Sequence, residues 1–447
     1  VSIEDFRSSL RKAKNYSSYK PSVVVKQISP SRFALMQEQM YKFPGFYFQT
    51  RTLRSYNHNF AAHVLGYIGE ANQVTISENP YYRPGDYIGV TGVESAYENY
   101  LRGRKGTKFY MVDVHNRQKG RYEDGRLDTA AVKGKDLITT LDYKLQEYGE
   151  LLMQNKAGSI VAIEPATGEI LALMSSPSYT PDKLIGRARI ENFPKLLNDS
   201  LLPLYNRAIK AQYPPGSTFK MLQALVALQE GVITSSTHYP CNNGFHIGNF
   251  HQACHHQQSF EVVGSIAQSC NAFYSYTFKN FLESSKMGGV RTAYEKWREH
   301  VLSFGFGDRV SYDFPQELKG FIPPSDYYQD RVFKASRWRA LPIISLSIGQ
   351  GEIQTTPMQM ANYAAILANR GYYYKPHVVK KIQDTELDPV LKEKHFTTVD
   401  PQHFELAVRG MEMVMSLDGG GTGRGSAIPG IVVCGKTGTA ENPHGAD

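Results

Sequence analysis

The sequence predicts an α+β fold from three stretches. Residues 159–163 and 169–174 are apolar runs that flank turn-forming residues at 165–168, which is the pattern of an antiparallel hairpin. Residues 217–231 follow a Pro-Pro-Gly sequence and repeat apolar side chains at helical spacing, up to a glycine that suits a helix C-terminus. Residues 357–368 begin with a proline suited to the first turn of a helix. Strands that frame a helical body indicate an α+β domain with an antiparallel sheet.

The first 135 residues alternate short helical and extended patterns. The expected elements are helices at 1–27, 32–42 and 90–100, an extended aromatic stretch at 46–54, a helix that runs into a strand at 61–69, and a strand at 108–114. A domain boundary is expected near 132–136. This gives an N-terminal domain at 1–135 and a second domain at 136–447, which opens with a helix over 143–154 capped by Asp142.

The composition is that of a globular protein. The 447 residues suffice for two or three domains, and the net charge of +8 comes from scattered basic residues without a Lys/Arg-rich run. We therefore expect no nucleic-acid partner, since a basic protein that faces an anionic polymer or membrane surface explains the charge. The sequence contains no apolar run long enough for a transmembrane helix and does not open with a signal peptide. We expect an N-terminal membrane anchor, and the last strands of the second domain, to lie outside this sequence.

Ser217 and Lys220 form a candidate nucleophile and base. In the predicted helix they lie three residues apart on one face, with the hydroxyl at the positive end of the helix dipole. A serine becomes a strong nucleophile only when a neighbouring base takes its proton. A lysine is such a base only where burial or nearby positive charge keeps its amine neutral. Alone, a Ser-x-x-Lys match is weak, because an N-cap serine before a solvated lysine also explains it.

Two further motifs favour the catalytic interpretation. Ser269-Cys270-Asn271 is a Ser-x-Asn sequence, and residues 436–439 read Lys-Thr-Gly-Thr. Serine–lysine acyl-transfer enzymes carry these three motifs in this order. The structural alternatives are that Ser269 caps a helix starting at Ala272 and that Asn271 satisfies a turn.

Residues 430–437 also match the pattern of a phosphate-binding P-loop. We reject a nucleotide site there because residues 431–434 suit a strand rather than a bend that cradles phosphate, and no helix start follows. The same residues suit a strand that presents Lys436 and its neighbours along an active-site edge, where Gly438 lets a ligand approach the backbone.

On these motifs the chain resembles the class B penicillin-binding proteins, the serine transpeptidases of bacterial peptidoglycan. The resemblance covers nearly the whole length. The stretches that carry it are 62–67, 92–94 and 101–103 in the N-terminal pedestal, and 214–220, 269–271, 348–352, 356–357 and 436–439 in the transpeptidase domain. It implies a serine β-lactamase-like domain, an antiparallel sheet with helices on both faces, joined to an elongated α+β pedestal of the dimerisation type. The sequence Tyr-Pro-Pro-Gly-Ser-Thr-Phe-Lys is more similar to the cell-elongation branch than to the division branch.

The resemblance also implies a role for each motif. The implied catalytic residues are Ser217 as nucleophile, Lys220 as proton acceptor, Ser269 and Asn271 as its hydrogen-bond partners, and Lys436 as the cation that keeps Lys220 neutral. The backbone N–H groups of Ser217 and Thr439 form the oxyanion hole, because donors aimed at a developing oxyanion lower the barrier. The implied substrate-binding residues are Thr437, Gly438 and Thr439.

The implied reaction is peptidoglycan cross-linking during elongation. Loss of D-alanine from a stem peptide leaves an acyl-enzyme that an amine on a neighbouring strand attacks, whereas a β-lactam acylates the same serine and remains. Two alternatives stay open: a D,D-carboxypeptidase or β-lactam-hydrolysing enzyme, and a non-catalytic β-lactam-binding sensor or scaffold. The implied partners are stem peptides and their lipid-linked precursor, β-lactam antibiotics and a membrane glycosyltransferase, at the periplasmic face of the bacterial inner membrane. This catalysis requires no cofactor.

Cys241, Cys254, His256 and Cys270 are the residue types of a zinc site. They fall in a His-rich stretch that departs from the family pattern, and their spacing matches no standard zinc finger. A Cys241–Cys254 disulfide, expected in an oxidising periplasm, and free thiols beside surface histidines stay open as alternatives. A structural zinc that fixed Cys270 would also fix the two neighbours of that cysteine in the Ser-x-Asn motif.

Overall fold

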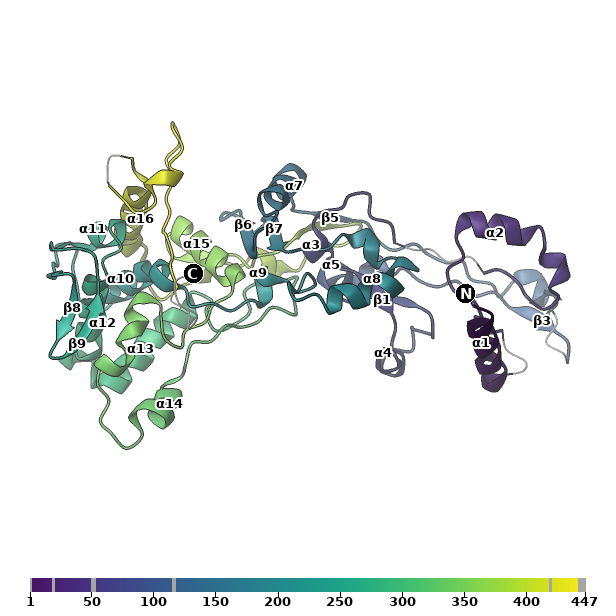
Figure 1. The fold of residues 1–447 in the computed structure, drawn as a ribbon, viewed down its shortest axis with the longest axis horizontal. Helices are drawn as coiled ribbons and strands as arrows, with labels where there is room; N and C mark the ends of the chain where they lie inside the picture. The colour runs from purple at the N-terminus through teal and green to yellow at the C-terminus, as the bar shows by residue number, and fades with distance from the viewer. Residues whose placement is uncertain (1, 18–20, 50–53, 115–117, 418–419, 441–447) are drawn as a thin grey trace. The chain divides into compact units, whose positions relative to one another are not determined.

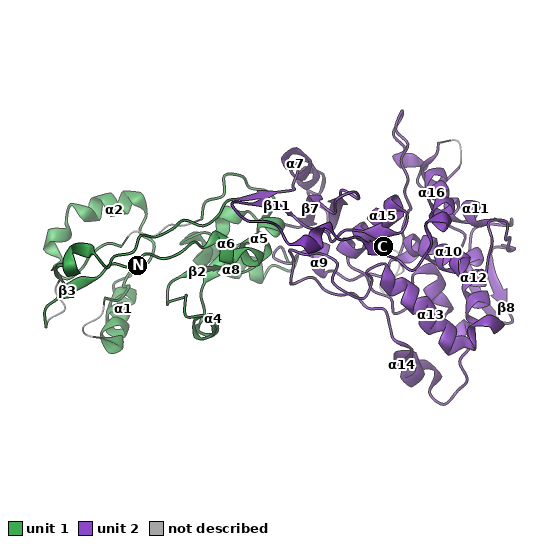
Figure 2. Cartoon of the chain, turned by 180° about the vertical axis from the view of Figure 1, so that it is seen from behind, with its two compact units in different colours: residues 1–136, 179–202 green, residues 137–178, 203–447 purple. Residues whose placement is uncertain are grey.

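The computed structural model describes residues 2–17, 21–49, 54–114, 118–417 and 420–440 (Figure 1). The chain divides into two compact units (Figure 2). Unit 1 contains residues 1–136 and 179–202, and unit 2 contains residues 137–178 and 203–447. In the described part of the chain, no helix has both the length and the apolar character needed to cross a bilayer.

Unit 1 is built from short helices and two antiparallel strand pairs, β1–β2 and β3–β4. Its elements are α1 (Ile3–Tyr16), α2 (Pro30–Gln37), η1 (Met40–Lys42), α3 (Ala62–Leu65), β1 (Ile68–Glu70), α4 (Gln73–Glu78), β2 (Tyr87–Gly89), α5 (Gly92–Ala96), α6 (Glu98–Leu101), β3 (Tyr110–Val112), β4 (Gln118–Arg121), η2 (Tyr122–Gly125), η3 (Pro181–Leu184) and α8 (Ala188–Leu197). The helix that runs into a strand at 61–69 is confirmed by α3 and β1. The extended aromatic stretch forms no strand over 46–48, and residues 50–53 of that prediction lie outside the described residues.

Two glycine motifs interlock in unit 1. Gly66 has φ +83°, and a Cβ added to it would lie 1.8 Å from the carbonyl oxygen of Thr91. Gly92 has φ +60°, and its added Cβ would lie 2.4 Å from the carbonyl oxygen of Val64. Only glycine tolerates both the conformation and the approach. The motifs at 62–67 and 92–94 therefore hold the two backbones together, which is a structural task.

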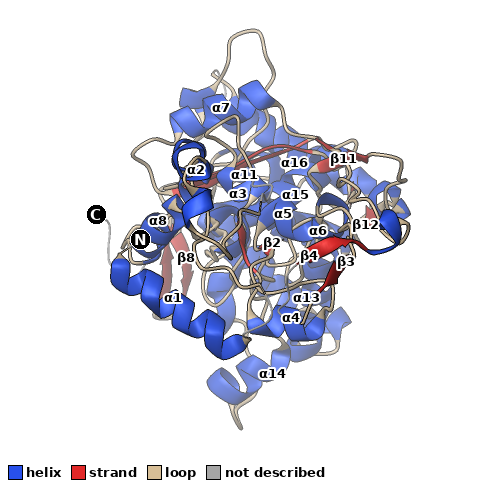
Figure 3. Ribbon diagram, turned by 90° about the vertical axis from the view of Figure 1, so that its right-hand side faces the viewer, coloured by secondary structure: helices blue, strands red, loops and turns tan. Residues whose placement is uncertain are grey.

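Unit 2 contains the long helices. Its elements are β5 (Leu137–Thr139), α7 (Tyr143–Leu152), β6 (Gly158–Ile163), β7 (Ile170–Ser176), α9 (Arg207–Lys210), η4 (Gly216–Phe219), α10 (Lys220–Gln229), β8 (Gly244–Ile247), β9 (Phe250–Ala253), α11 (Val262–Ala267), α12 (Asn271–Leu282), η5 (Ser285–Met287), α13 (Val290–Ser303), α14 (Ser325–Tyr328), η6 (Gln329–Phe333), η7 (Leu341–Ile348), α15 (Pro357–Asn369), β10 (Tyr372–Tyr373), β11 (Val379–Ile382), η8 (Pro389–Lys392), β12 (His395–Phe396), α16 (Pro401–Met415) and η9 (Arg424–Ser426). All six two-stranded sheets described in the chain are antiparallel, and Figure 3 shows their strands as short segments among helices. The predicted α+β class is confirmed.

The local signals in unit 2 act as expected. The hairpin β6–β7 is confirmed, with Ala162 paired to Ala172 across it. The Asp142 side chain accepts a hydrogen bond from Leu145 N at 3.0 Å, which caps α7. Thr356 caps α15 in a capping box one residue before the proline at its first turn.

Helix α10 is the centre of the unit 2 core. From Lys220 to Leu228 every one of its residues is buried, because α12, α13, α16 and η7 all pack against it. Helix α11 packs closely on α16, where a Cβ added to Gly410 would lie 2.7 Å from Ile266 Cβ. A helix that is buried along nearly its whole length therefore carries the lysine of the first motif at its first residue.

Candidate active site

The nucleophile candidate Ser217 lies on a tight turn. Pro215 precedes Gly216, whose φ of +57° lies in the left-handed region that favours glycine. Residues 216–219 form the short helix η4, which continues directly into α10. The Thr218 hydroxyl donates to the Pro215 carbonyl at 2.6 Å, which fixes this turn. The sequence predicted one helix from Ser217. The structure instead begins with a 3₁₀ turn over 216–219, and the α-helix starts at Lys220.

Lys220 is fully buried, with 0% of its surface exposed. Its Nζ donates to Ser269 O at 2.7 Å, Ser269 Oγ at 3.1 Å and Asn271 Oδ1 at 2.6 Å. Burial, and secondarily the charge of Lys436, lower the pKa of Lys220 from 10.5 to about 7. The positive end of the α10 dipole acts in the same direction. An amine with this pKa is partly neutral at physiological pH and can accept a proton.

The turn between α11 and α12 presents the second motif. Ser269 has φ +54°, an uncommon conformation for a residue with a side chain. Cys270 is the N-cap residue of α12 and its N–H donates to Ser265 O at 3.0 Å, so the turn is closed from both sides. The alternative that Ser269 caps a helix beginning at Ala272 is wrong, because α12 begins at Asn271. The strained turn aims both polar side chains of the motif at Lys220.

The third motif lies against the nucleophile turn. A Cβ added to Gly216 would lie 2.3 Å from Thr439 O, and one added to Gly438 would lie 3.0 Å from the Thr218 methyl group. Burial lowers the pKa of Lys436 to about 8. Thr437 Oγ1 lies 2.9 Å from the hydroxyl of Thr422.

The strand predicted over this motif is wrong. The described residues from 432 to 440 form no β-sheet hydrogen bonds with a neighbouring strand. The nearest pairing is an isolated antiparallel bridge between Ile428 and Ile431. A β-strand is defined by the backbone groups of a neighbour, and none of the described residues supplies one here. The sequence signal at 431–434 is therefore a propensity that finds no partner in this structure.

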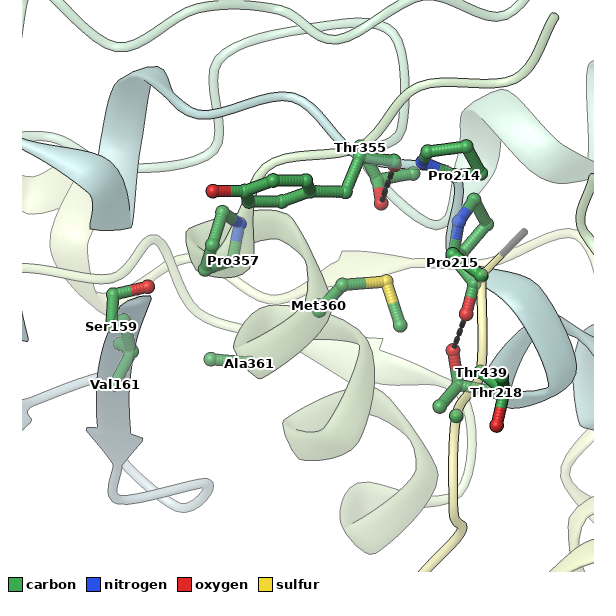
Figure 4. A pocket seen from close by; sticks show the side chains of 13 residues that line it. Ser159, Val161, Pro214, Pro215, Thr218, Thr355, Pro357, Met360, Ala361 and Thr439 are labelled. Atoms are coloured by element: carbon green, nitrogen blue, oxygen red, sulfur yellow. Dashed lines mark hydrogen bonds between the residues drawn. The ribbon is translucent and has the colours of Figure 1, made fainter. Parts of the chain in front are cut away.

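A cavity of about 470 Å³ borders the third motif in unit 2. Figure 4 shows Ser159 and Val161 of β6 on one side, Met360 and Ala361 of α15 between, and Thr439 on the other side. The remaining lining residues are Tyr213, Pro214, Pro215, Thr218, Thr355, Pro357, Gly438 and Ala440. The cavity thus lies between β6, α15 and the third motif, and Pro214, Pro215 and Thr218 bring the nucleophile turn to its lining.

The cysteine–histidine cluster also assembles. One ligand atom from each of Cys241, Cys254, His256 and Cys270 lies within 4.8 Å of the other three. Cys254 Sγ lies 3.1 Å from His256 Nδ1 and 3.9 Å from Cys270 Sγ. All three cysteines of the cluster are unbridged, as is the exposed Cys434. Hydrogen bonds, first from the Cys270 thiol, lower the pKa of Cys254. The hydrogen bond to the Cys254 thiolate, and then burial, raise the pKa of Cys270.

This cluster is joined to the second motif. Asn271 N donates to Cys254 Sγ at 3.3 Å, and Asn271 Nδ2 donates to Ala253 O at 2.8 Å. The hairpin β8–β9, which carries Ala253, packs against α12 (Figure 1). The side-chain carbonyl of Asn271 is thereby left to face Lys220.

Sequence reasoning left the stretch at 348–352 without a chemical role. In the structure Gly349 O accepts from Gly216 N at 2.9 Å, and Gln350 Nε2 donates to Thr439 O at 3.3 Å. The Gly-x-Gly pattern signalled a special backbone at this point but gave no indication of which residues it touches.

The geometry is that of a serine–lysine acyltransferase: a serine at a helix start, a buried lysine of lowered pKa one turn later, a Ser-x-Asn pair on that lysine, and a second lysine on an adjoining segment. Comparison with known proteins gives the same class. Residues 158–445 match the penicillin binding protein transpeptidase domain, and residues 2–139 match the penicillin-binding protein dimerisation domain.

The peptidoglycan D,D-transpeptidase MrdA of Acinetobacter baumannii is 30% identical over 98% of this chain and 64% of its own length. A Pseudomonas aeruginosa PBP2 structure in complex with WCK 5153 is 27% identical, with a TM-score of 0.69 over 88% of this chain and 82% of that one. A peptidoglycan synthase complex, solved in work on the structural coordination of polymerization and crosslinking, contains a chain that is 26% identical. The TM-score is 0.73 over 99% of this chain and 76% of that one. The chain belongs to the penicillin-binding protein family, in its PBP2 (MrdA) branch. It spans about two thirds of the length of its curated relatives, 64% of one and 69% of another.

Proposed function

We propose that this chain is the catalytic part of a peptidoglycan D,D-transpeptidase that cross-links stem peptides during cell elongation. The observation that carries the proposal is the buried Lys220, which Ser269 and Asn271 hold one turn from Ser217. Its lowered pKa supplies a base at neutral pH. The names of the MrdA relatives supply the substrate class.

The reaction follows from the site in two halves. Lys220 takes the hydroxyl proton as Ser217 Oγ attacks the carbonyl of the penultimate D-alanine, and the backbone N–H groups of Ser217 and Thr439 stabilise the oxyanion. The proton passes to the leaving D-alanine amine. An amine of a second stem peptide then attacks the acyl-enzyme, and its proton returns through the same lysine. Thr437, Gly438 and Thr439 hold the substrate carboxylate and backbone, and Lys436 keeps the field at Lys220 positive.

The experiment compares turnover of a stem-peptide donor with and without an amine acceptor. We expect a cross-linked product that depends on the acceptor and is absent in Ser217→Ala. Hydrolysis alone would support the carboxypeptidase alternative, and the absence of both products would support a β-lactam-binding sensor. Mass spectrometry after β-lactam treatment must locate the adduct on Ser217.

The proposal extends to partners and place. A transpeptidase acts on strands made by a glycosyltransferase, and we propose an assembly with a membrane glycosyltransferase at the periplasmic face of the inner membrane. The similar structure described as a peptidoglycan synthase complex supports an assembly that joins polymerization and crosslinking. The lipid-linked precursor and β-lactam antibiotics complete the expected ligands. The domain division near residue 135, with the pedestal before it and the transpeptidase domain after it, belongs to the same proposal; the compact unit 1 differs from that pedestal in that it also contains residues 179–202.

We also propose that the cysteine–histidine cluster holds a structural zinc ion. Three thiolates and one imidazole are a donor set that zinc prefers, and all four donor atoms converge within one small volume. The pKa of the Cys254 thiol is already lowered, which is compatible with its deprotonation on metal binding. The metal takes no part in acyl transfer and would fix the turn that carries Ser269 and Asn271.

The zinc proposal is tested by metal analysis of reduced, purified protein. We expect close to one zinc per chain, lost in Cys241→Ser and retained in Cys434→Ser, the matched control with an exposed thiol outside the cluster. A chelator should lower the unfolding midpoint of wild-type protein and of Cys434→Ser, which bind zinc. It should leave the midpoint of Cys241→Ser unchanged. Reduced wild-type protein without zinc would contradict the proposal.

A further inference from the structure

The pair Gly349-Gln350 follows the last turn of η7, and the reaction steps described above assign it no role. Gly349 has φ +69°, which ends η7 and turns the chain toward the nucleophile segment. The pair is fixed from behind, because Gln350 N donates to Ser345 O at 3.1 Å. The neighbouring Glu352 is held by the Tyr328 hydroxyl at 2.8 Å. A segment anchored in this way can position others.

One member of the pair holds the residue before the nucleophile. Gly216 N donates to Gly349 O at 2.9 Å. A Cβ added to Gly349 would lie 2.4 Å from Gly216 O, so the two backbones are in direct contact. Since Gly216 immediately precedes Ser217, this contact fixes the peptide group that contains the Ser217 N–H.

The other member of the pair holds the carbonyl of Thr439, the residue whose N–H is the second proposed oxyanion donor. The half-buried Gln350 side chain donates from Nε2 to Thr439 O at 3.3 Å. The same carbonyl lies against Gly216, where an added Cβ would be 2.3 Å away. Gly349, Gly216 and Thr439 are therefore stacked backbone on backbone, and the Gln350 side chain reaches across the stack.

We propose that Gln350 is a positioning residue that sets the separation between the two oxyanion N–H donors, those of Ser217 and Thr439. Oxyanion stabilisation depends on donors that are already aimed before charge develops, so a change in their separation affects the transition state more than the bound ground state. The inference rests on the proposed acyl transfer at Ser217. It concerns a residue that touches neither the nucleophile nor the base.

The test separates the amide donor from the shape of the side chain. Gln350→Met keeps the length of the side chain and removes the donor, and Gln350→Glu replaces the donor with an acceptor that faces the Thr439 carbonyl. For each variant, stopped-flow acylation by a chromogenic β-lactam gives the dissociation constant of the initial complex and the acylation rate constant separately. Gln229→Met is the matched control, since Gln229 is bonded to Asp400 at the other end of α10.

We expect the acylation rate constant of Gln350→Met to fall about five- to tenfold, the value of one neutral hydrogen bond, with an unchanged dissociation constant and unfolding midpoint. Gln350→Glu should lose more at about pH 8. It should recover relative to wild type as the pH falls toward roughly 4–5, where a protonated carboxyl again donates. Packing alone produces no such recovery.

Wild-type rate constants in both variants would overturn the proposal, and so would a change confined to the dissociation constant. A loss in Gln350→Glu that does not recover with pH, together with an unaffected Gln350→Met, would also overturn it. If wild-type protein itself forms no adduct on Ser217, the proposed function fails instead, and the two failures are therefore distinguishable.

Discussion

The rate of acylation should report the titration of Lys220. Its pKa is lowered from 10.5 to about 7, first by burial and then by the charge of Lys436. With the ordinary value, roughly one amine in three thousand would be neutral at pH 7, whereas with the lowered value about half are neutral. The buried environment therefore raises the concentration of active base about a thousandfold.

Only the neutral amine accepts the serine proton, so the acylation rate constant should rise with pH. The neutral fraction grows from about a tenth at pH 6 to about nine tenths at pH 8, which predicts an increase of about tenfold. Around pH 8, Lys436 in turn loses its charge, because its pKa is about 8, and the support that its charge gives to the site declines. We therefore expect a bell-shaped profile with its acid limb centred near pH 7.

Lys436→Met tests the cause of the shift. Removing the second cation should raise the pKa of Lys220 and move the acid limb to higher pH, so that the variant is impaired more at pH 6 than at pH 8. The assay is stopped-flow acylation by a chromogenic β-lactam between about pH 5 and pH 9, with unfolding midpoints as a control for folding. A profile that is flat across this range would refute the assignment of Lys220 as the base. An acid limb that does not move in Lys436→Met would refute the contribution of Lys436 to the lowered pKa of Lys220.

Three further outcomes follow from contacts in unit 2. Ser269→Ala should lower acylation about a hundredfold, and Ser269→Gly should lower it equally while being about 1 kcal/mol more stable in urea unfolding than the alanine variant, because φ is +54° there. Gly216→Ala should abolish the adduct seen by intact-protein mass spectrometry, because its Cβ would lie 2.3 Å from Thr439 O. Gly410→Val should lower the free energy of unfolding by about 1–3 kcal/mol, because its Cβ meets Ile266 at 2.7 Å. Unchanged values would contradict each argument.

Local rules predicted the elements that local chemistry determines. Asp142 and Thr356 cap α7 and α15 where the sequence placed helix starts, and the turn at 165–168 produced its hairpin. These signals depend on residues within one turn of each other. The same holds for Ser217 and Lys220, whose spacing is set by a single helical turn.

The rest of the site depends on contacts that no local pattern contains. Ser269 lies 49 residues from Lys220, and its side chain reaches the lysine only because its backbone adopts φ +54° between two packed helices. Gln350 lies 89 residues from Thr439. The sequence shows the glycines at which two backbone segments come close, but it does not show which segment each glycine contacts, because that depends on packing. The strand expected at 430–437 shows the reverse case, a local preference without the neighbour that a strand requires.

The buried lysine links stability to activity in this fold. Moving a charged amine into a covered helix start is unfavourable, so folding lowers the pKa of Lys220 and raises the fraction of the neutral form, which is the form that catalysis needs. The destabilisation is tolerated because the other residues of α10 are apolar or hydrogen-bonded and are covered by neighbouring elements, which are η4, α11, α12, α13, η7 and α16. Asn271 and Ser269 satisfy the amine without adding a negative charge, which would raise the pKa of Lys220 again. The neutral polar character of the Ser-x-Asn pair is therefore a requirement of the base: Asn271→Asp keeps the shape and the acceptor, but should shift the acid limb of acylation to higher pH.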